Sequence, residues 1–198
     1  MTHPDHMHER RYRAEADRLR SPERLTLLEV PRVVQLCTEG IDAVSVLDVG
    51  TGTGIFAEAF AVAPAGTSPA GRAGVVRRVT GIDPNADLMA RARALAPGVD
   101  FLEGTAERLP FADKSFDLVF LGHVLHETDD RAAALSEARR VAKLRVAVLE
   151  WPWKDEERGP PLAHRLEPST ILGLGREAGF TSVDRVTLSH MELFRLSP

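Results

Sequence analysis

The sequence predicts an α/β domain in which a doubly wound, mostly parallel β-sheet carries helices on both faces. Short apolar runs alternate with helical patterns from Val44 onward, which is typical of buried strands joined by crossover helices. A glycine-rich turn follows the first apolar run directly. In sheets of this kind, ligands bind beyond the carboxyl ends of the strands, where the winding direction reverses. We therefore expect a ligand site at that turn.

Residues 1–40 are expected to form an N-terminal helical lead-in or lid, with the main domain over 41–198. Ser21 is a candidate N-cap and Pro22 suits the first helical position, while Gly40 provides a C-terminal stop. The apolar residues expected to face the domain are Leu25, Leu28, Val33, Val34 and Leu36.

Within the main domain, apolar patterns and turn signals place each element in order. Expected strands cover 44–49, 75–83, 99–104, 115–122 and 144–151, and expected helices cover 55–63, 85–96, 129–143 and 169–180. The last two alternating segments, 181–189 and 191–197, are expected to pair as an antiparallel hairpin.

Composition excludes several classes of protein. The net charge of −4 gives no general attraction to nucleic acid or to anionic lipid, and no apolar run approaches the ~18 residues of a membrane span. A lone cysteine, Cys37, is expected in the core, and the amino terminus has no apolar signal-peptide segment, so a cytoplasmic protein is expected. No metal site is expected, although His3, His6 and His8 offer nitrogen ligands.

The turn after the first strand contains Gly50, Gly52 and Gly54, which suit a sharp strand-to-helix turn that a ligand approaches closely. Read from Gly52, the same turn fits the dinucleotide pattern, so it does not separate a nicotinamide or flavin cofactor from S-adenosylmethionine. Asp83 closes the second strand, where a carboxylate can accept hydrogen bonds from ribose hydroxyls. A plain tight turn and a solvated strand-end aspartate are the alternatives without a ligand.

Beyond the second strand, "FLEGTAERLPFADKSFDLVFLGHVLHE" followed by "ALSEARRVAK" resembles the class I S-adenosylmethionine-dependent methyltransferases. The resemblance is to the branch of ubiquinone and menaquinone methyltransferases, also described as methyltransferase type 11. It implies a Rossmann-like, seven-stranded sheet with an antiparallel last strand, S-adenosyl-L-methionine as cofactor and S-adenosyl-L-homocysteine as product. The chain departs from the family where Thr105 replaces a common aspartate, and where a K-P-G-G turn is reduced to "AKLR" at 142–145.

The resemblance also implies which residues hold the cofactor. Asp48 would order the amino group of the methionine part, Asp83 would hold the ribose, and Gly122 with His123 would lie near the sulfonium. The whole set implied is Asp48, Gly50, Thr51, Gly52, Gly54, Asp83, Pro84, Leu88, Thr105, Ala106, Glu107, Gly122 and His123.

A base is needed only when the methyl acceptor carries a proton at the attacking atom. The catalytic candidates are His126 and His123, and Glu127 is a further candidate, because all three follow the fourth strand. Further candidates, on the acceptor side, are Trp151, Trp153, His164, Arg165 and Tyr12, each with core packing, an ion pair or a surface helix as its alternative.

We therefore expect a methyltransferase that transfers a methyl group to an oxygen, nitrogen or carbon atom of a small molecule. The alternatives are a nicotinamide-dependent oxidoreductase that uses the same glycine turn, and a non-catalytic S-adenosylmethionine-binding protein.

Overall fold

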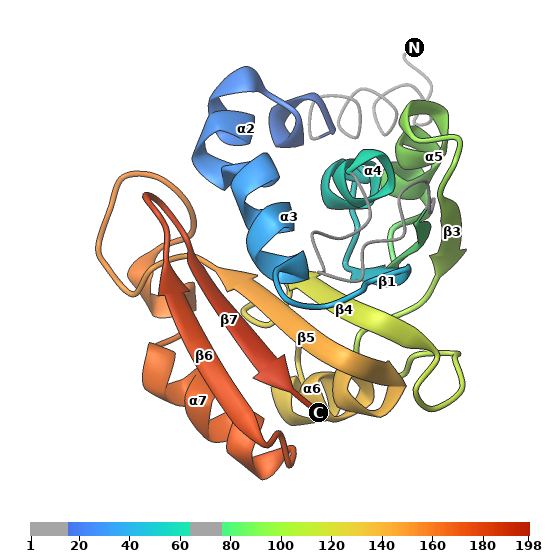
Figure 1. Ribbon diagram of the computed structural model, residues 1–198. Helices are drawn as coiled ribbons and strands as arrows, with labels where there is room; N and C mark the ends of the chain where they lie inside the picture. Colours follow the sequence, from blue (N-terminus) through green and yellow to red (C-terminus); the bar gives the residue numbers. More distant parts are fainter. Residues whose placement is uncertain (1–15, 64–76) are drawn as a thin grey trace.

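A computed structural model describes residues 16–63 and 77–198 (Figure 1). Its seven strands form one sheet in the order β3-β2-β1-β4-β5-β7-β6. The strands are β1 (Ser45–Val49), β2 (Arg78–Asp83), β3 (Asp100–Glu103), β4 (Phe116–Gly122), β5 (Ala142–Glu150), β6 (Ser182–Thr187) and β7 (Glu192–Ser197). The helices are α2 (Pro22–Leu28), α3 (Val30–Thr38), α4 (Ile55–Val62), α5 (Ala86–Leu95), α6 (Arg131–Val141) and α7 (Pro168–Glu177), with a 3₁₀ turn η1 (Leu162–His164).

The fold class expected from the sequence is confirmed. Strands β1 to β5 pair in parallel, and β7 runs antiparallel to both of its neighbours, β5 and β6. The chain winds outward from β1 to β3 and then returns to place β4 on the other side of β1. The switch point therefore lies between β1 and β4, directly above the glycine turn.

Alternate residues of the strands supply two separate cores, one on each face of the sheet. In β4, Leu118 and Phe120 pack with helices α3, α4 and α5, whereas Val119 and Leu121 pack with α6 and α7. Figure 1 shows these two helical layers on opposite sides of the sheet. This period of two is what a strand covered on both faces requires, because every side chain must meet an apolar partner.

The described part of the N-terminal lead-in contains helical residues 16–19 and then helices α2 and α3, which pack into the first of these cores. Ser21 caps α2 by accepting from the Arg24 amide at 3.3 Å, as expected. Glu29, in the left-handed region at φ 46°, turns the chain from α2 into α3. Of the five residues expected to be buried, Leu25 is an error: it is exposed on α2, and Leu27 is buried in its place.

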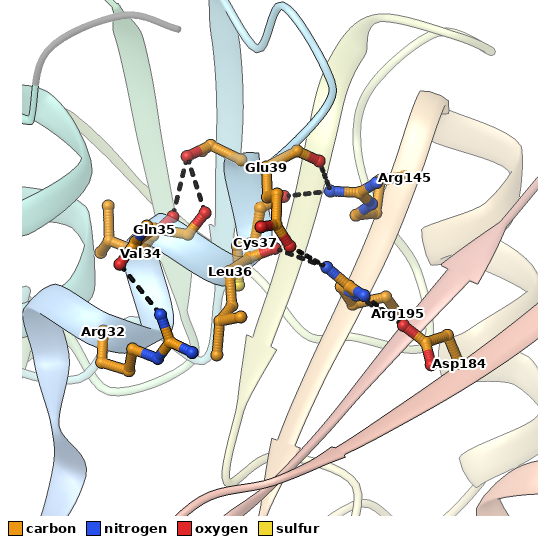
Figure 2. Close-up of polar contacts among 10 residues, drawn as sticks. Arg32, Val34, Gln35, Leu36, Cys37, Glu39, Arg145, Asp184 and Arg195 are labelled. Atoms are coloured by element: carbon orange, nitrogen blue, oxygen red, sulfur yellow. Dashed lines mark hydrogen bonds and ion pairs between the residues drawn. The ribbon is translucent and has the colours of Figure 1, made fainter. Parts of the chain in front are cut away.

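Two arginines from strands distant in sequence bind the carboxyl end of α3 through hydrogen bonds (Figure 2). Arg145 of β5 donates to the carbonyl oxygens of Cys37 and Glu39 at 2.9 and 2.8 Å. Arg195 of β7 contacts the Glu39 carboxylate at 2.9 Å and also pairs with Asp184. These guanidinium groups satisfy carbonyls that a helix terminus leaves without intrahelical partners. Cys37 itself is fully buried, as expected.

The shortened connection before the fifth strand does not change the topology. β5 begins at Ala142, immediately after α6, and not at 144 as expected. Pairing with β4 shifts between Phe116↔Ala142 and Leu118↔Arg145, so β5 carries one extra residue there. A β-bulge of this kind absorbs the mismatch without moving the rest of the strand. Within the described residues, no helix is long and apolar enough to cross a membrane.

Candidate active site

A cavity of about 890 Å³ opens at the carboxyl ends of β1, β2 and β4. The glycine turn forms its floor, helix α2 and the residues before it cover one side, and the loop after β5 closes another. The cavity therefore lies at the topological switch point, where the sequence predicted a ligand site.

The glycine turn has a backbone that only glycine adopts without strain. Gly50, Gly52 and Gly54 have φ values of 64°, 52° and 77°. A Cβ on Gly50 would lie 2.3 Å from Val124 Cγ2, whereas a Cβ on Gly52 would meet no atom within 4 Å and would project into open space. Gly52 thus leaves room for a ligand to approach the backbone, and Gly50 permits the close contact with Val124.

Asp48 lies at the end of β1 and is almost completely buried. Its Oδ2 accepts from Thr51 Oγ1 at 2.7 Å and from the Ala57 amide at 3.0 Å. Burial outweighs these hydrogen bonds and raises the pKa of Asp48 to about 7. Both of these bonds use Oδ2, and Asp48 lines the cavity, so a cation there would be a favourable partner.

Asp83 lies at the end of the neighbouring strand β2 and fixes the glycine turn. Its Oδ2 accepts from the Gly52 amide and its Oδ1 from the Asn85 amide, both at 2.8 Å. Burial raises the pKa of Asp83, although the two amides oppose the shift. The carboxylate keeps lone pairs that hydroxyl groups of a ligand can use.

Twelve of the thirteen residues implied for cofactor binding line this cavity, and Gly54 does not. Gly54 is the N-cap of α4, and a Cβ there would lie 3.0 Å from Ala92 Cβ and 3.2 Å from Phe101 Cζ. Its role is close packing of α4 against α5 and β3. Thr105, which replaces the family's usual aspartate, lines the cavity and pairs with Arg108 in an isolated β-bridge.

His123 lies at the end of β4 and lines the cavity. It occupies the left-handed region at φ 61°, its ring stacks on Trp151 at a centroid distance of 5.2 Å, and its Nε2 lies 3.2 Å from Met191 Sδ. Burial, followed by the charges of Arg24 and His126, holds the pKa of His123 well below its usual value. The imidazole is therefore neutral at neutral pH.

His126 does not line the cavity, in contrast to the expectation for a base. Its Nδ1 lies 2.7 Å from Glu150 Oε2, and its backbone amide donates to the other oxygen of the same carboxylate. Burial opposes the charged imidazole, but the hydrogen bond and charge of Glu150 raise the pKa of His126 overall. The pair ties the turn after β4 to the end of β5.

Of the residues expected on the acceptor side, Trp151 lines the cavity, whereas Trp153, His164 and Arg165 do not. Trp153 is 41% exposed, and His164 lies exposed in η1. Arg165 is buried and donates to the carbonyls of Pro152, Arg158 and Pro160. Its guanidinium also lies 5.7 Å from the centroid of Trp151. Arg165 thus shapes the loop and does not face a substrate.

The residues that sequence reasoning missed come mainly from the N-terminal helices. Arg18 and Arg24 line the cavity, and so do the apolar residues Leu27, Leu28 and Phe56. Nothing in their spacing along the sequence identifies them as site residues, because they reach the cavity only through the packing of helices over the strand ends. Tyr12 and the three N-terminal histidines lie outside the described residues. Among the residues in 16–63 and 77–198, no cluster that could hold a metal ion occurs.

The sequence also matches a model of a known protein family. Residues 47–146, about half of the chain, match the family described as a methyltransferase domain. The chain belongs to this methyltransferase-domain family. The match runs from β1, through the glycine turn and Asp83, to β5, so it contains most of the strand ends that form the cavity. The resemblance to class I methyltransferases is thereby confirmed.

Relatives and solved structures agree with this assignment. The domain is 37% identical over 105 residues to demethylmenaquinone methyltransferase of Chlorobaculum tepidum, covering 53% of this chain and 39% of that protein. It is 34% identical over 124 residues to the ubiquinone/menaquinone biosynthesis C-methyltransferase UbiE of Bartonella tribocorum, covering 56% of this chain and 44% of that protein. These matches therefore span less than half the length of either relative.

Among solved structures, the fold is similar to an S-adenosylmethionine-dependent methyltransferase from Aquifex aeolicus. The TM-score is 0.74 at 22% sequence identity, with 92% of this chain and 96% of that chain covered. At this identity the similarity establishes the shared fold, which extends well beyond the family match at both ends.

Proposed function

We propose that this methyltransferase domain binds S-adenosylmethionine and transfers its methyl group to a small-molecule acceptor. The observation that carries the proposal is the pair of buried carboxylates, Asp48 and Asp83, on either side of the glycine turn in one cavity. A cofactor with an ammonium group and an adjacent ribose matches this pair in charge and in hydrogen bonding. The family relationship supports the same cofactor.

When bound, S-adenosylmethionine supplies an activated methyl group on a sulfonium. The protein then has to orient the acceptor, exclude water and receive a proton where the acceptor carries one. Asp48 would hold the amino group and Asp83 the ribose. Pro84, Leu88, Thr105, Ala106 and Glu107 would surround the adenine, and Gly122 and His123 would face the reacting atoms.

His123 is a better candidate than His126 for contact with the acceptor. His123 lines the cavity and is neutral, whereas the Nδ1 of His126 is occupied by Glu150. We assign His126 a positioning role, in which it holds Glu150 and the turn after β4. Residues 1–40 would act as a lead-in that covers the cofactor, consistent with the lining contributed by Arg18, Leu19 and α2.

Calorimetry with the purified protein tests the cofactor. S-adenosylhomocysteine is expected to bind, and NAD is not, because the residues that form most of the cavity belong to a methyltransferase domain. Binding of NAD without binding of S-adenosylhomocysteine would contradict the proposal and favour an oxidoreductase. Asp83→Asn is expected to weaken S-adenosylhomocysteine binding, because an amide is a poorer acceptor for two ribose hydroxyls.

Turnover is tested separately with methyl-labelled cofactor and a panel of small oxygen, nitrogen and carbon nucleophiles. His123→Asn is the suitable variant, because asparagine tolerates a positive φ. It is expected to slow transfer while S-adenosylhomocysteine still binds, and His126→Gln should have the smaller effect on transfer. Cofactor binding without transfer to any acceptor would instead favour a non-catalytic binding protein.

A further inference from the structure

Helix α2 presents Arg24 to the cavity, and one nitrogen of its guanidinium has no hydrogen-bond partner among the described residues. That nitrogen is the Nε, which is buried. Neighbouring arginines differ: Arg20 donates to the Thr53 carbonyl and to Glu58, and Arg158 pairs with Glu23. A buried guanidinium N–H without a partner is unfavourable, so its position beside the cavity suggests a ligand group.

The charges around Arg24 do not compensate for its burial. Burial and the positive charge of Arg18 lower the pKa of Arg24, and the opposing effect of Glu127 is smaller than either. The Glu127 side chain is 77% exposed, and its Oε1 lies 3.8 Å from His126 Nε2. An anion bound beside Arg24 and Arg18 would therefore stabilise the charge of Arg24 more than the exposed Glu127 carboxylate does.

Arg24 lies on the acceptor side of the cavity. It lines the same cavity as His123 and Glu127, and both of these residues follow β4. Helix α2 also meets the loop after β5, because Arg158 Nη2 lies 3.3 Å from Glu23 Oε1. The methionine part of the cofactor is expected instead at the glycine turn, beside Asp48. The stacked rings of His123 and Trp151 provide an aromatic surface on the acceptor side.

We infer that the methyl acceptor is a small planar molecule with an anionic, carboxylate-like group, and that Arg24 is the specificity-determining residue that binds this group. Arg18 adds positive charge at the same place, and the His123 and Trp151 rings contact the planar part. The inference rests on the proposed methyltransferase function, which supplies the cofactor on the opposite side. Arg24 has no part in the chemical step.

The test compares planar aromatic acids with their carboxamides, which have nearly the same shape but no charge. Benzoic, 2-naphthoic and indole-2-carboxylic acids and their amides are titrated by calorimetry into protein saturated with S-adenosylhomocysteine. At least one acid is expected to bind roughly tenfold more tightly than its amide, as a charged hydrogen bond allows. Arg24→Gln should abolish this preference, and Arg24→Lys should retain part of it.

The control variant is Arg32→Gln, because Arg32 is an exposed arginine on α3 outside the cavity. It should leave the preference for acids unchanged. Arg24→Gln should fold normally, since the described side chains give its guanidinium no hydrogen bond to lose. The far-ultraviolet circular dichroism of both variants verifies this, and Arg24→Lys preserves the test if the glutamine variant does not fold.

Three results would overturn the inference. The first is equal binding of acids and amides throughout the series, and the second is a preference that survives in Arg24→Gln. The third is weaker binding of S-adenosylhomocysteine to Arg24→Gln with unchanged binding of 5′-methylthioadenosine, which lacks the amino acid part. That result would assign Arg24 to the cofactor carboxylate. If the wild-type protein bound no S-adenosylhomocysteine, the proposed function would fail, and the same acid and amide titrations on the ligand-free protein would still decide the role of Arg24.

Discussion

Asp48, at the end of β1, destabilises the ligand-free protein but is suited to bind a cationic group. Asp48 is buried with a pKa of about 7, so its ionised form is held in a place that disfavours charge. Its hydrogen bonds to Thr51 and Ala57 both use Oδ2, and the residue lines the cavity. Such a carboxylate destabilises the free protein and binds a cation well once one is present.

Asp48→Asn is therefore expected to stabilise the free protein at about pH 8. Between the ordinary pKa of 3.8 and the folded value of about 7, folded Asp48 holds a proton that the unfolded chain has lost. Its contribution to the free energy of unfolding thus falls as pH rises through this range. Urea unfolding should show the variant more stable at pH 8 by on the order of a few kcal/mol, with the difference shrinking toward pH 5.

The same substitution should weaken S-adenosylhomocysteine binding at pH 8, because an amide cannot pair with an ammonium group. In the wild-type protein, affinity should fall as pH drops below about 7, where Asp48 becomes protonated. Calorimetry at several pH values measures both effects. An affinity that does not change between pH 6 and 8 would argue against contact between Asp48 and the amino group.

Two glycines of the turn differ in what a methyl group would meet. Alanine at Gly50 would clash with Val124, whereas alanine at Gly52 would meet only the cost of a positive φ. Gly50→Ala should lose more unfolding free energy than Gly52→Ala, for which about 1 kcal/mol is expected. Thermal unfolding measures this difference, and equal losses would show that Val124 moves aside freely.

At the scale of elements, the loop after β5 depends on one buried side chain. Arg165 donates to three loop carbonyls and contacts the Trp151 ring, which in turn stacks on His123. The loop has little other regular structure, so these hydrogen bonds fix its shape. Arg165 therefore positions the Trp151 ring, and through it the His123 ring at the cavity.

Arg165→Met is expected to loosen this loop while the sheet remains intact. Hydrogen exchange should become at least several-fold faster over residues 152–160 than in the wild-type protein, because three carbonyls lose a charged donor. Arg91→Met provides a control, since Arg91 is exposed on α5 and its guanidinium lies 3.8 Å from the Asp17 carboxylate. Unchanged exchange in the Arg165 variant would mean that packing alone holds the loop.

The end of α3 depends in the same way on Arg145. The Cys37 thiol is buried beneath this end, and burial raises the pKa of Cys37 to about 12. The native thiol should react very slowly with a disulfide reagent, because the thiolate is scarce and covered. Arg145→Met removes donors from the Cys37 and Glu39 carbonyls and should accelerate labelling under native conditions. No acceleration would show that α3 stays closed without Arg145.

On the scale of the whole molecule, the cavity joins parts that are distant in sequence. Val33, Val34 and Cys37 of the lead-in belong to the same core as Phe120 and Leu149 of the sheet. The described lead-in is therefore expected to unfold together with the sheet as one cooperative unit. A ligand between α2 and the strand ends should stabilise this unit as a whole.

S-adenosylhomocysteine at about 100 times its dissociation constant is expected to raise the free energy of unfolding by about 2.7 kcal/mol. Tryptophan fluorescence and circular dichroism should report one coincident urea transition, shifted equally by the ligand. Separate transitions would contradict a single cooperative unit. A fluorescence change without a shift in the midpoint would indicate binding to the unfolded chain as well.

Much of the fold follows from local patterns in the sequence. The alternation of apolar runs and helical segments predicted the strand and helix order, the terminal hairpin and the site at the glycine turn. The errors arose where packing against neighbouring elements determines the burial of a residue or the start of a strand. Leu25 fits the apolar helical pattern but faces solvent, and the start of β5 at Ala142 depends on a bulge against β4.

The sequence by itself determined the family, the sheet and the residues that follow each strand, because these depend on chemistry close together in the chain. Only the tertiary structure separated His123 from His126, since the partner of His126 comes from a different strand. The same holds for Arg24 and Arg165, both ordinary arginines in the sequence. Arg24 lines the cavity, and its Nε has no hydrogen-bond partner among the described residues, whereas Arg165 is enclosed by a loop. Burial and partners depend on how distant segments pack, and no local pattern encodes them.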